Sequence, residues 1–298
     1  MFGSMALDAY DGVPRRCKRV RDSDYEMDDT ENTRQSWNIA TRNHNAHKGD
    51  QASFLAKGET LFPEELELLG AIDGAKLVHL QCNAGQDSVG LGKRGAIVTG
   101  IDLSDEAIAF ATKLARDVGV NASFERHELL SWLHTTSERF DIAFSSYGAV
   151  GWLPDLDKWA QGIARVLKPG GRFVYVEFHP LVWSWGEDLR PTKDDYFSRE
   201  AFLEPVGDYV KASGAALLAE REGTITANTI PAKSWQYTLA EIVDALVRAG
   251  LVLECLREYP HANGCKVHEK LVPTEGRRWI WPEGIARTPL MFGLAARR

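Results

Sequence analysis

The sequence lacks the features that would assign it to several specialised classes of protein. Only four of its 298 residues are cysteines (Cys17, Cys82, Cys255 and Cys265), and they form no Cys-x-x-Cys pair. Such scattered cysteines argue against structural zinc and a disulfide framework and fit a reducing compartment. No apolar run approaches the ~20 residues of a membrane span, and the N-terminus has no apolar signal core. We therefore expect a cytoplasmic protein that contacts no membrane.

The sequence is also poor in positive charge. It has 35 Lys and Arg against 42 Asp and Glu, which gives a formal net charge of −7. This balance provides no basic surface for nucleic acid. The basic run from Arg15 to Arg21 is followed by acidic residues, and residues 1–30 show no apolar period. We expect a solvated, disordered tail there rather than a nuclear address.

A regular alternation of strands and helices follows the polar N-terminal region. The pattern predicts helices over 86–93, 104–118, 129–134 and 155–167, and strands over 77–81, 96–101, 121–125, 140–145 and 172–178. After an interruption it resumes with a helix capped by Thr238 and strands over 251–258 and 289–295. Strands separated by helices pair in parallel and bind ligands at their carboxyl ends. We predict an α/β, Rossmann-like, mostly parallel sheet of seven strands with helices on both faces.

Two further regions complete the predicted organisation. Residues 31–76 are helical in character, with an amphipathic helix from Thr60 to Leu69. Residues 180–234 break the alternation with tryptophans, prolines and β-rich pieces such as Gly223 to Thr226. We interpret 77–298 as the main domain and 180–234 as a β-rich insertion that covers its binding site. The Lys168-Pro169-Gly170-Gly171 segment is predicted to be a turn before the fifth strand.

The turn after the first strand is the most informative segment. It reads His79-Leu80-Gln81-Cys82-Asn83-Ala84-Gly85-Gln86-Asp87, and the next strand ends on Asp102. A strand, a tight turn, a helix and a second strand that ends on an acid hold a nucleoside-bearing cofactor, with the acid on the ribose hydroxyls. Only Gly85 of the expected glycines is present, because Gln81 and Asn83 occupy the other positions. A pyrophosphate needs close backbone approach across the whole turn, so the turn favours S-adenosylmethionine over NAD.

Each candidate cofactor residue has a competing structural interpretation. We expect Asp102 to bind the ribose, although it could only cap a helix. Leu103 is expected against the adenine face, and Glu128, with the Leu129 amide, at the adenine amino group, although Glu128 could be an ordinary loop residue. Asp87 would fix the turn, and Ser145 begins a turn beneath the methyl group. His79 and Cys82 are interpreted as core residues.

Together these segments resemble class I S-adenosylmethionine-dependent methyltransferases, over about 77–258 plus the last strand. Further matching motifs are Gly100 to Ser104, Phe140 to Ala143 and Leu167 to Arg172, and the His-Leu-Gln-Cys variant of the turn marks a subgroup. Trp37 to Asn45 and Glu177 to Pro180 resemble small-molecule N-methyltransferases of microbial secondary metabolism. An azapteridine, such as a toxoflavin precursor, is the nearest substrate that this resemblance implies.

The resemblance also implies where the remaining site residues lie. Helices in 31–76 would form a lid over the cofactor, which Trp37, Gln81 and Asn83 would help to bind. Aromatic walls suit a flat heteroaromatic substrate, and His179 or Tyr147 would act as the general base or orienting group. The candidate substrate-binding residues are His44, Tyr147, Trp152, Glu177, His179, Trp183 and Trp235. His44 and His47 have metal-like spacing but no third ligand, so no metal is expected.

Two alternatives remain open at this point. A protein or nucleic-acid methyltransferase is disfavoured by the acidic balance and by Ser145 to Gly148, which replaces an Asn-Pro-Pro-Tyr-type turn. A non-catalytic S-adenosylmethionine-binding protein would keep the turn and Asp102, but its pocket would be filled or closed. We expect a small-molecule substrate and a monomer or homodimer.

Overall fold

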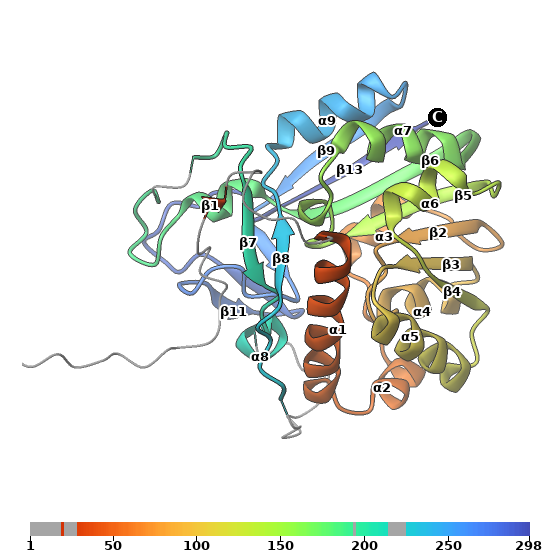
Figure 1. Ribbon diagram of the computed structural model, residues 1–298, viewed down its shortest axis with the longest axis horizontal. Coiled ribbons are helices and arrows are strands. Elements are labelled where there is room, and N and C mark those ends of the chain that lie inside the picture. The colour runs from red at the N-terminus through yellow and green to blue at the C-terminus, as the bar shows by residue number, and fades with distance from the viewer. Residues whose placement is uncertain (1–18, 21–28, 193–194, 214–224) are drawn as a thin grey trace, which may run out of the picture.

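The computed structural model describes residues 19–20, 29–192, 195–213 and 225–298. A seven-stranded sheet forms its centre (Figure 1). In spatial order the strands are Ala122–Arg126 (β4), Ile97–Asp102 (β3), Lys76–Leu80 (β2), Phe140–Ser146 (β5), Leu167–Phe178 (β6), Met291–Arg297 (β13) and Val252–Tyr259 (β9). All pairs from β4 to β6 are parallel, and β13 is antiparallel to both neighbours. This arrangement confirms the predicted fold class, and the strand order reverses between β2 and β5, where such sheets bind ligands.

Helices cover both faces of the sheet. One face packs against Leu129–Thr135 (α6), Leu156–Val166 (α7) and Leu239–Arg248 (α9). The other packs against Pro63–Leu69 (α3), Gln86–Lys93 (α4) and Asp105–Val118 (α5). Trp132 and Trp159 are 5% and 1% exposed in the first of these layers. The burial of large apolar side chains on both faces fixes the sheet between the helices.

Local sequence signals explain most of the helix boundaries. Ser104 accepts a hydrogen bond from the Ala107 amide at the start of α5, and Gly119 ends that helix in the left-handed conformation. Thr238 and Glu241 form a capping box at the start of α9. The structure differs from the predicted turn at 168–171 before the fifth strand, because β6 already begins at Leu167. The pairing of β5 with β6 shifts register between Phe140 and Ile142, so the turn is an irregularity within the strand.

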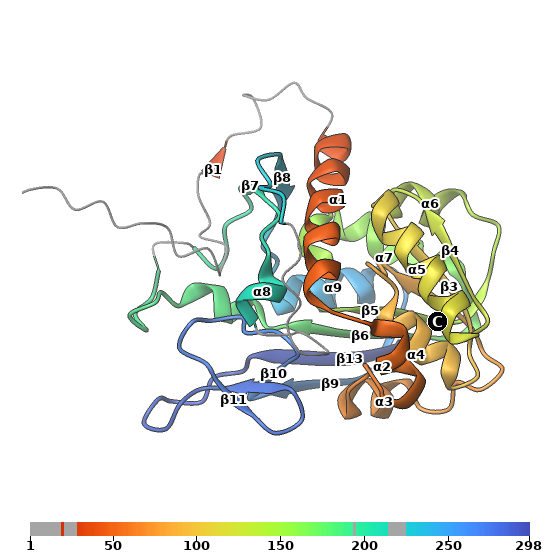
Figure 2. The same cartoon turned by 90° about the horizontal axis from the view of Figure 1, so that it is seen from below.

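The N-terminal helices and the insertion lie together beside the sheet. Asp29–His47 (α1) lies between α5 and the insertion, and Gln51–Lys57 (α2) follows it (Figure 2). The described part of the insertion comprises Pro180–Ser184 (η3), Ala201–Pro205 (β7), Tyr209–Ser213 (α8) and Pro231–Ser234 (β8). Arg19–Val20 (β1) pairs with β7, and α1 begins at Asp29, so β1 and the first two residues of α1 fall within the range predicted as a tail. The rest of residues 1–28, together with Gly223 and Thr224, lies outside the described residues.

Besides the sheet of β1, β7 and β8, the structure has another three-stranded sheet, which was not predicted from the sequence. It consists of His261–Asn263 (β10), Arg278–Ile280 (β12) and Val272–Thr274 (β11), and it lies between β9 and β13 in the chain. The remaining element, Val150–Trp152 (η2), follows β5. No helix in the part of the chain that the structure describes is long and apolar enough to cross a membrane.

Candidate active site

A cavity of about 1010 Å³ lies at the carboxyl ends of β2, β3 and β5. Its volume is at the upper end of the range for small-molecule sites, so it has room for a cofactor and a second small molecule. Its wall combines the turn after β2, the ends of β3 and β5, helix α1 and loops near β8 and β12. The cavity therefore lies at the point where the strand order reverses, and both the N-terminal helical region and the insertion contribute to its wall.

The turn after β2 keeps a glycine-type backbone without two of its glycines. Gln81 and Asn83 have φ angles of 52° and 49°, in the left-handed region, as Gly85 does at 77°. This conformation costs a residue with a Cβ roughly 1–2 kcal/mol. Side-chain hydrogen bonds hold it here, because Gln81 Nε2 donates to the Ala149 carbonyl at 2.9 Å and Asn83 Oδ1 accepts from the Ala84 amide at 2.6 Å. Gln81 and Asn83 both line the cavity.

Gly85 lies behind the turn rather than in the cavity wall. A Cβ at this position would lie 2.5 Å from Ala111 Cβ on α5 and 3.1 Å from a ring carbon of Phe124 on β4. The absence of a side chain therefore allows α5 to pack closely against the turn. This is a packing role, and Gly85 contacts a cofactor at most through its backbone.

Asp102 lies at the end of β3, where the ribose acid was predicted. Its carboxylate accepts hydrogen bonds from the Asn83 and Ser104 amides, both at 2.8 Å. A carboxylate has about four acceptor positions, so roughly two remain for a diol. Burial raises the pKa of Asp102, while the backbone donors favour its ionised form. Asp102 and Leu103 both line the cavity, as the prediction requires.

Glu128 has a structural role in addition to its place in the cavity wall. Its carboxylate caps α6 by accepting hydrogen bonds from the Leu130 and Ser131 amides at 2.9 and 2.7 Å. Leu129 also lines the cavity. The contact of Glu128 with adenine stays a prediction, because its carboxylate already holds the helix terminus.

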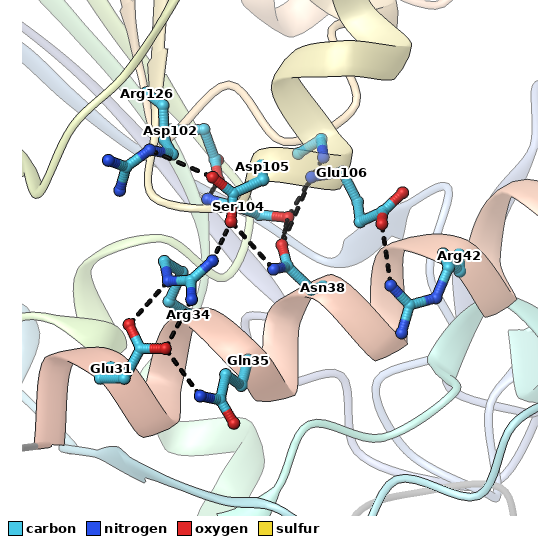
Figure 3. Close-up of polar contacts among 11 residues, drawn as sticks. Glu31, Arg34, Gln35, Asn38, Arg42, Asp102, Ser104, Asp105, Glu106 and Arg126 are labelled. Atoms are coloured by element: carbon cyan, nitrogen blue, oxygen red, sulfur yellow. Dashed lines mark hydrogen bonds and ion pairs between the residues drawn. The ribbon is translucent and has the colours of Figure 1, made fainter.

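Hydrogen bonds attach helix α1 to the residues that follow Asp102 (Figure 3). Asn38 Oδ1 accepts a hydrogen bond from Ser104 Oγ at 2.6 Å, and Asn38 Nδ2 donates to Asp105 at 3.1 Å. Trp37, next to Asn38, lines the cavity and packs edge-on against Trp152, with ring centroids 5.2 Å apart. The contacts of Asn38 therefore fix the position of a cavity wall relative to Asp102. No sequence pattern indicated these contacts, because Asn38 and Ser104 are distant in the chain.

The part of the cavity wall that follows β5 and β6 is aromatic. Tyr147 and Phe178 both line it, with ring centroids 5.3 Å apart and ring planes at 35°. Trp152 and Trp235 line the cavity as well, as predicted for the substrate wall. Tyr147 has a φ of 30°, so the backbone after β5 is held in an unusual conformation.

His179 is buried and engaged elsewhere, although it was predicted as a catalytic group. Its Nε2 lies 3.0 Å from Glu258 Oε1, and its Nδ1 accepts from the Leu181 amide at 3.2 Å at the start of η3. It is not among the residues that line the cavity. Only Tyr147 of the two predicted catalytic residues therefore faces the site.

Glu177 organises the turn after β5 from behind. Its carboxylate accepts hydrogen bonds from the amides of Gly148, Ala149 and Phe178 and from the Tyr175 hydroxyl. Because it is buried and outside the cavity wall, it holds the turn that carries Tyr147 instead of contacting a substrate.

The other predicted site residues are placed as follows. Trp183 packs at the edge of the apolar core, and Ser145 is buried beside Ser146, which does line the cavity. His44 is 1% exposed with Nε2 3.1 Å from the Gly207 carbonyl, and burial lowers its pKa to about 4. His79 is 3% exposed with Nδ1 2.8 Å from Ser88 Oγ, and it also belongs to the cavity wall, as Cys82 does, so the interpretation of these two as core residues is incomplete.

Several charged residues of the cavity were missed or only partly foreseen. Lys48, after α1, lines the cavity, and burial lowers its pKa to about 8. Asp87, predicted only to fix the turn, also lines it, and burial raises its pKa. The guanidinium of Arg277 lies 4.4 Å from the ring centroid of Phe62 and donates to the Thr60 carbonyl at 2.8 Å. Arg277 belongs to the small sheet region, which carried no sequence pattern. Among the described residues, no three or more His, Cys, Asp or Glu side chains gather as they would around a metal ion.

Comparison with known proteins agrees with this geometry. Residues 78–171 match the family model described as a methyltransferase domain. A ubiquinone biosynthesis O-methyltransferase of Alkalilimnicola ehrlichii is 25% identical over 158 residues, which cover 46% of this chain and 64% of that protein. An uncharacterized methyltransferase of Synechocystis is 33% identical over 129 residues, which cover 42% of this chain and 58% of that protein. The chain thus spans less than two thirds of the length of either relative.

A solved structure shows the same fold over most of the chain. The S-adenosylmethionine-dependent methyltransferase of Mesorhizobium loti matches with a TM-score of 0.53 and 22% identity, over 82% of this chain and all of that one (100%). The chain therefore has the fold of that enzyme, and residues 78–171 are similar to a methyltransferase domain. The position of Asp102 beside the turn suits the ribose of a nucleoside-bearing cofactor, as the sequence predicts.

Proposed function

We propose that this protein transfers a methyl group from S-adenosylmethionine to a ring nitrogen of a small planar heteroaromatic metabolite in secondary metabolism. An azapteridine such as a toxoflavin precursor is the nearest candidate. The observation that carries the proposal is one cavity whose wall holds Asp102 at the end of β3 and also the rings of Tyr147 and Phe178, after β5 and at the end of β6. A non-catalytic cofactor-binding protein has no need of the second, aromatic part of this space.

The chemistry divides between the cofactor and the chain. When bound, S-adenosylmethionine supplies a methyl group that its positively charged sulfur has already activated. Asp102 binds the ribose hydroxyls, and Leu103 and Leu129 form the apolar surfaces for adenine. The Phe178 ring holds a flat acceptor by stacking, and Tyr147 beside it helps to keep water from the reacting atoms. Alignment of acceptor and methyl group is then the main contribution of the protein to the rate.

The charged part of the cavity wall favours a compact polar metabolite. Asp29 and Lys233 form an ion pair of 2.7 Å in this wall, and Lys158, with 65% of its side chain exposed, also lines it. The name of the Alkalilimnicola relative gives ubiquinone biosynthesis as that protein's role. A strongly apolar acceptor would lie against these charges without satisfying them. The acidic composition also disfavours a nucleic-acid substrate. We propose that the protein acts in the cytoplasm as a monomer or homodimer.

Methyl transfer from ¹³C-methyl-labelled S-adenosylmethionine tests this proposal. The purified protein is offered planar nitrogen heterocycles, simple phenols, oligonucleotides and peptides, and the labelled products are located by NMR. We expect N-methyl products from the heterocycles, with an equal amount of S-adenosylhomocysteine. Phe178→Ala should raise KM for the heterocycle, whereas Phe197→Ala, at a side chain 70% exposed and outside the cavity wall, should not. Transfer only to phenols, or no transfer despite cofactor binding, would contradict the proposed substrate class.

A further inference from the structure

Two consecutive glutamates on α3 have opposite surroundings. Glu64 accepts hydrogen bonds from Arg278 and from Asn263 Nδ2 at 3.2 Å, and His261 Nε2 lies 3.0 Å from it. Burial alone would raise the pKa of Glu64, but the hydrogen bonds from His261, Arg278 and Asn263 lower it to about 2. Glu64 therefore remains ionised, and it forms the charged outer end of a chain of polar contacts.

Glu65 is fully buried, and the hydrogen bonds it receives come from neutral groups. The Tyr147 hydroxyl donates to its Oε1, and the Phe62 amide donates to its Oε2 at 2.9 Å. Burial, together with the negative charge of Asp87, raises the pKa of Glu65 well above its usual range. A carboxylate in such surroundings takes up a proton readily.

Tyr147 connects Glu65 to the cavity. Its hydroxyl donates to Glu65 and accepts from Asn263 Nδ2 at 3.1 Å. A hydroxyl has one donor and two acceptor positions, so one acceptor position is left. Tyr147 and Asn263 line the cavity and Glu65 does not, so the carboxyl lies behind the hydroxyl as seen from the substrate. Asn263 also bonds Glu64, which fixes the hydroxyl from the other side.

We propose that Tyr147 and Glu65 together accept the proton of a ring N–H group as that nitrogen is methylated. This inference rests on the proposed function and narrows its substrate class to heterocycles with a ring N–H. The N–H proton passes to Tyr147 Oη, and the original hydroxyl proton passes to Glu65 Oε1. The released nitrogen electron pair forms the N–CH₃ bond, and the electrons of the broken S–CH₃ bond remain on sulfur. The products are the N-methyl heterocycle, S-adenosylhomocysteine and protonated Glu65.

Other charged groups around Tyr147 and Glu65 influence the pH range in which Glu65 can accept a proton. Asp87 on α4 and Glu64 on α3 add negative charge near Glu65. Lys48, after α1, and Arg277, before β12, favour the ionised form of Asp87. Burial acts against these cations and raises the pKa of Asp87. When Asp87 is ionised, its charge raises the pKa of Glu65 and so strengthens Glu65 as a proton acceptor. The Asp87→Asn variant should therefore move the pH profile to lower pH without abolishing it.

The pH dependence of methyl transfer tests the inference. With an N–H heterocycle the wild type should show kcat/KM rising with pH as Glu65 ionises. Glu65→Gln should lose this rise and lower kcat about 100-fold, the usual contribution of a positioned base. Glu67→Gln, on the same helix but ion-paired with Arg257 at the surface, is the matched control and should behave as wild type. An acceptor whose nitrogen is already anionic should restore most of the rate of Glu65→Gln.

Controls separate this inference from the proposed function. Calorimetric titration with S-adenosylhomocysteine should give the same affinity for Glu65→Gln and wild type, because Glu65 is outside the cavity wall. If Glu65→Gln binds poorly because it does not fold, Tyr147→Phe replaces it and should lose the same pH dependence. Wild-type kcat and pH profile in a well-folded Glu65→Gln would overturn the proton-accepting pair alone. A wild type that binds the cofactor product but methylates no heterocycle would overturn the proposed function and this inference together.

Discussion

The replacement Gly85→Ala tests how the cofactor turn is packed. Two physical effects act at this position. The φ of 77° is unfavourable for a residue with a Cβ, and the new methyl group would lie 2.5 Å from Ala111 Cβ. Gly119, at the end of α5, has nearly the same φ of 75°, but a Cβ added there would meet no other atom within 4 Å. Gly119→Ala therefore measures the backbone effect alone.

The expected magnitudes follow from these two effects. The left-handed conformation should cost alanine about 1 kcal/mol at either position. Forcing a methyl group into closely packed surroundings adds roughly 1–3 kcal/mol at Gly85. We therefore expect the free energy of unfolding to fall by about 1 kcal/mol in Gly119→Ala and by about 2–4 kcal/mol in Gly85→Ala.

Urea unfolding followed by circular dichroism measures both variants. Gly85→Ala should also bind S-adenosylhomocysteine more weakly, because relief of the clash moves α5 or the turn that carries Asn83. Gly119 is remote from the cavity wall, so its variant should bind normally. Equal destabilisation of the two variants would refute the close packing of α5 on the turn through Gly85.

Three further predictions concern the surroundings of the cavity. Asn38→Ala should weaken S-adenosylhomocysteine binding about fivefold in calorimetry, since a hydrogen bond contributes about 1 kcal/mol. The control Gln35→Ala, which loses a hydrogen bond to Glu31 in its own helix, should bind as the wild type does. Burial lowers the pKa of His79 to about 3, so between about pH 6.5 and 3 the unfolded chain binds a proton that the folded chain does not. The free energy of unfolding of the wild type should therefore fall as the pH falls through this window, and it should fall less steeply in His79→Gln. The same pH dependence of urea unfolding in both proteins would contradict this. Glu177→Gln places an amide group among four hydrogen-bond donors and should lower the free energy of unfolding by about 2–3 kcal/mol in urea. An unchanged midpoint of urea unfolding would contradict this.

The order of the main elements could be predicted because each has a local signal. Ser104 marks the start of α5 and Gly119 its end, Thr238 caps the start of α9, and the glycine-poor turn follows a buried strand. These signals act within a few residues, so a sequence is enough to find them. Asp102 could be placed in the site for the same reason, since the end of a parallel strand next to such a turn defines its position.

The polar contacts behind the cavity wall could not be predicted, because they join distant segments. Glu65 lies on a helix before the first strand of the main sheet, Tyr147 follows β5, and Asn263 belongs to a small sheet between β9 and β13. No local pattern distinguishes Glu65 from Glu64 or Glu67 on the same helix. His179 shows the opposite case. Its type and its position at the end of a strand suggested catalysis, but its Nε2 lies 3.0 Å from Glu258 on β9.

Cofactor binding through Asp102 is the central claim, and titration calorimetry with S-adenosylhomocysteine tests it most directly. The wild type should bind, and Asp102→Asn should bind about 30-fold more weakly, which corresponds to roughly 2 kcal/mol for charge-assisted bonds to the ribose hydroxyls. Asp117→Asn, on α5 and outside the cavity wall, is the control and should bind as wild type does. No binding by a folded wild type, or equal affinity of wild type and Asp102→Asn, would contradict the assigned role of Asp102 and the site built around it.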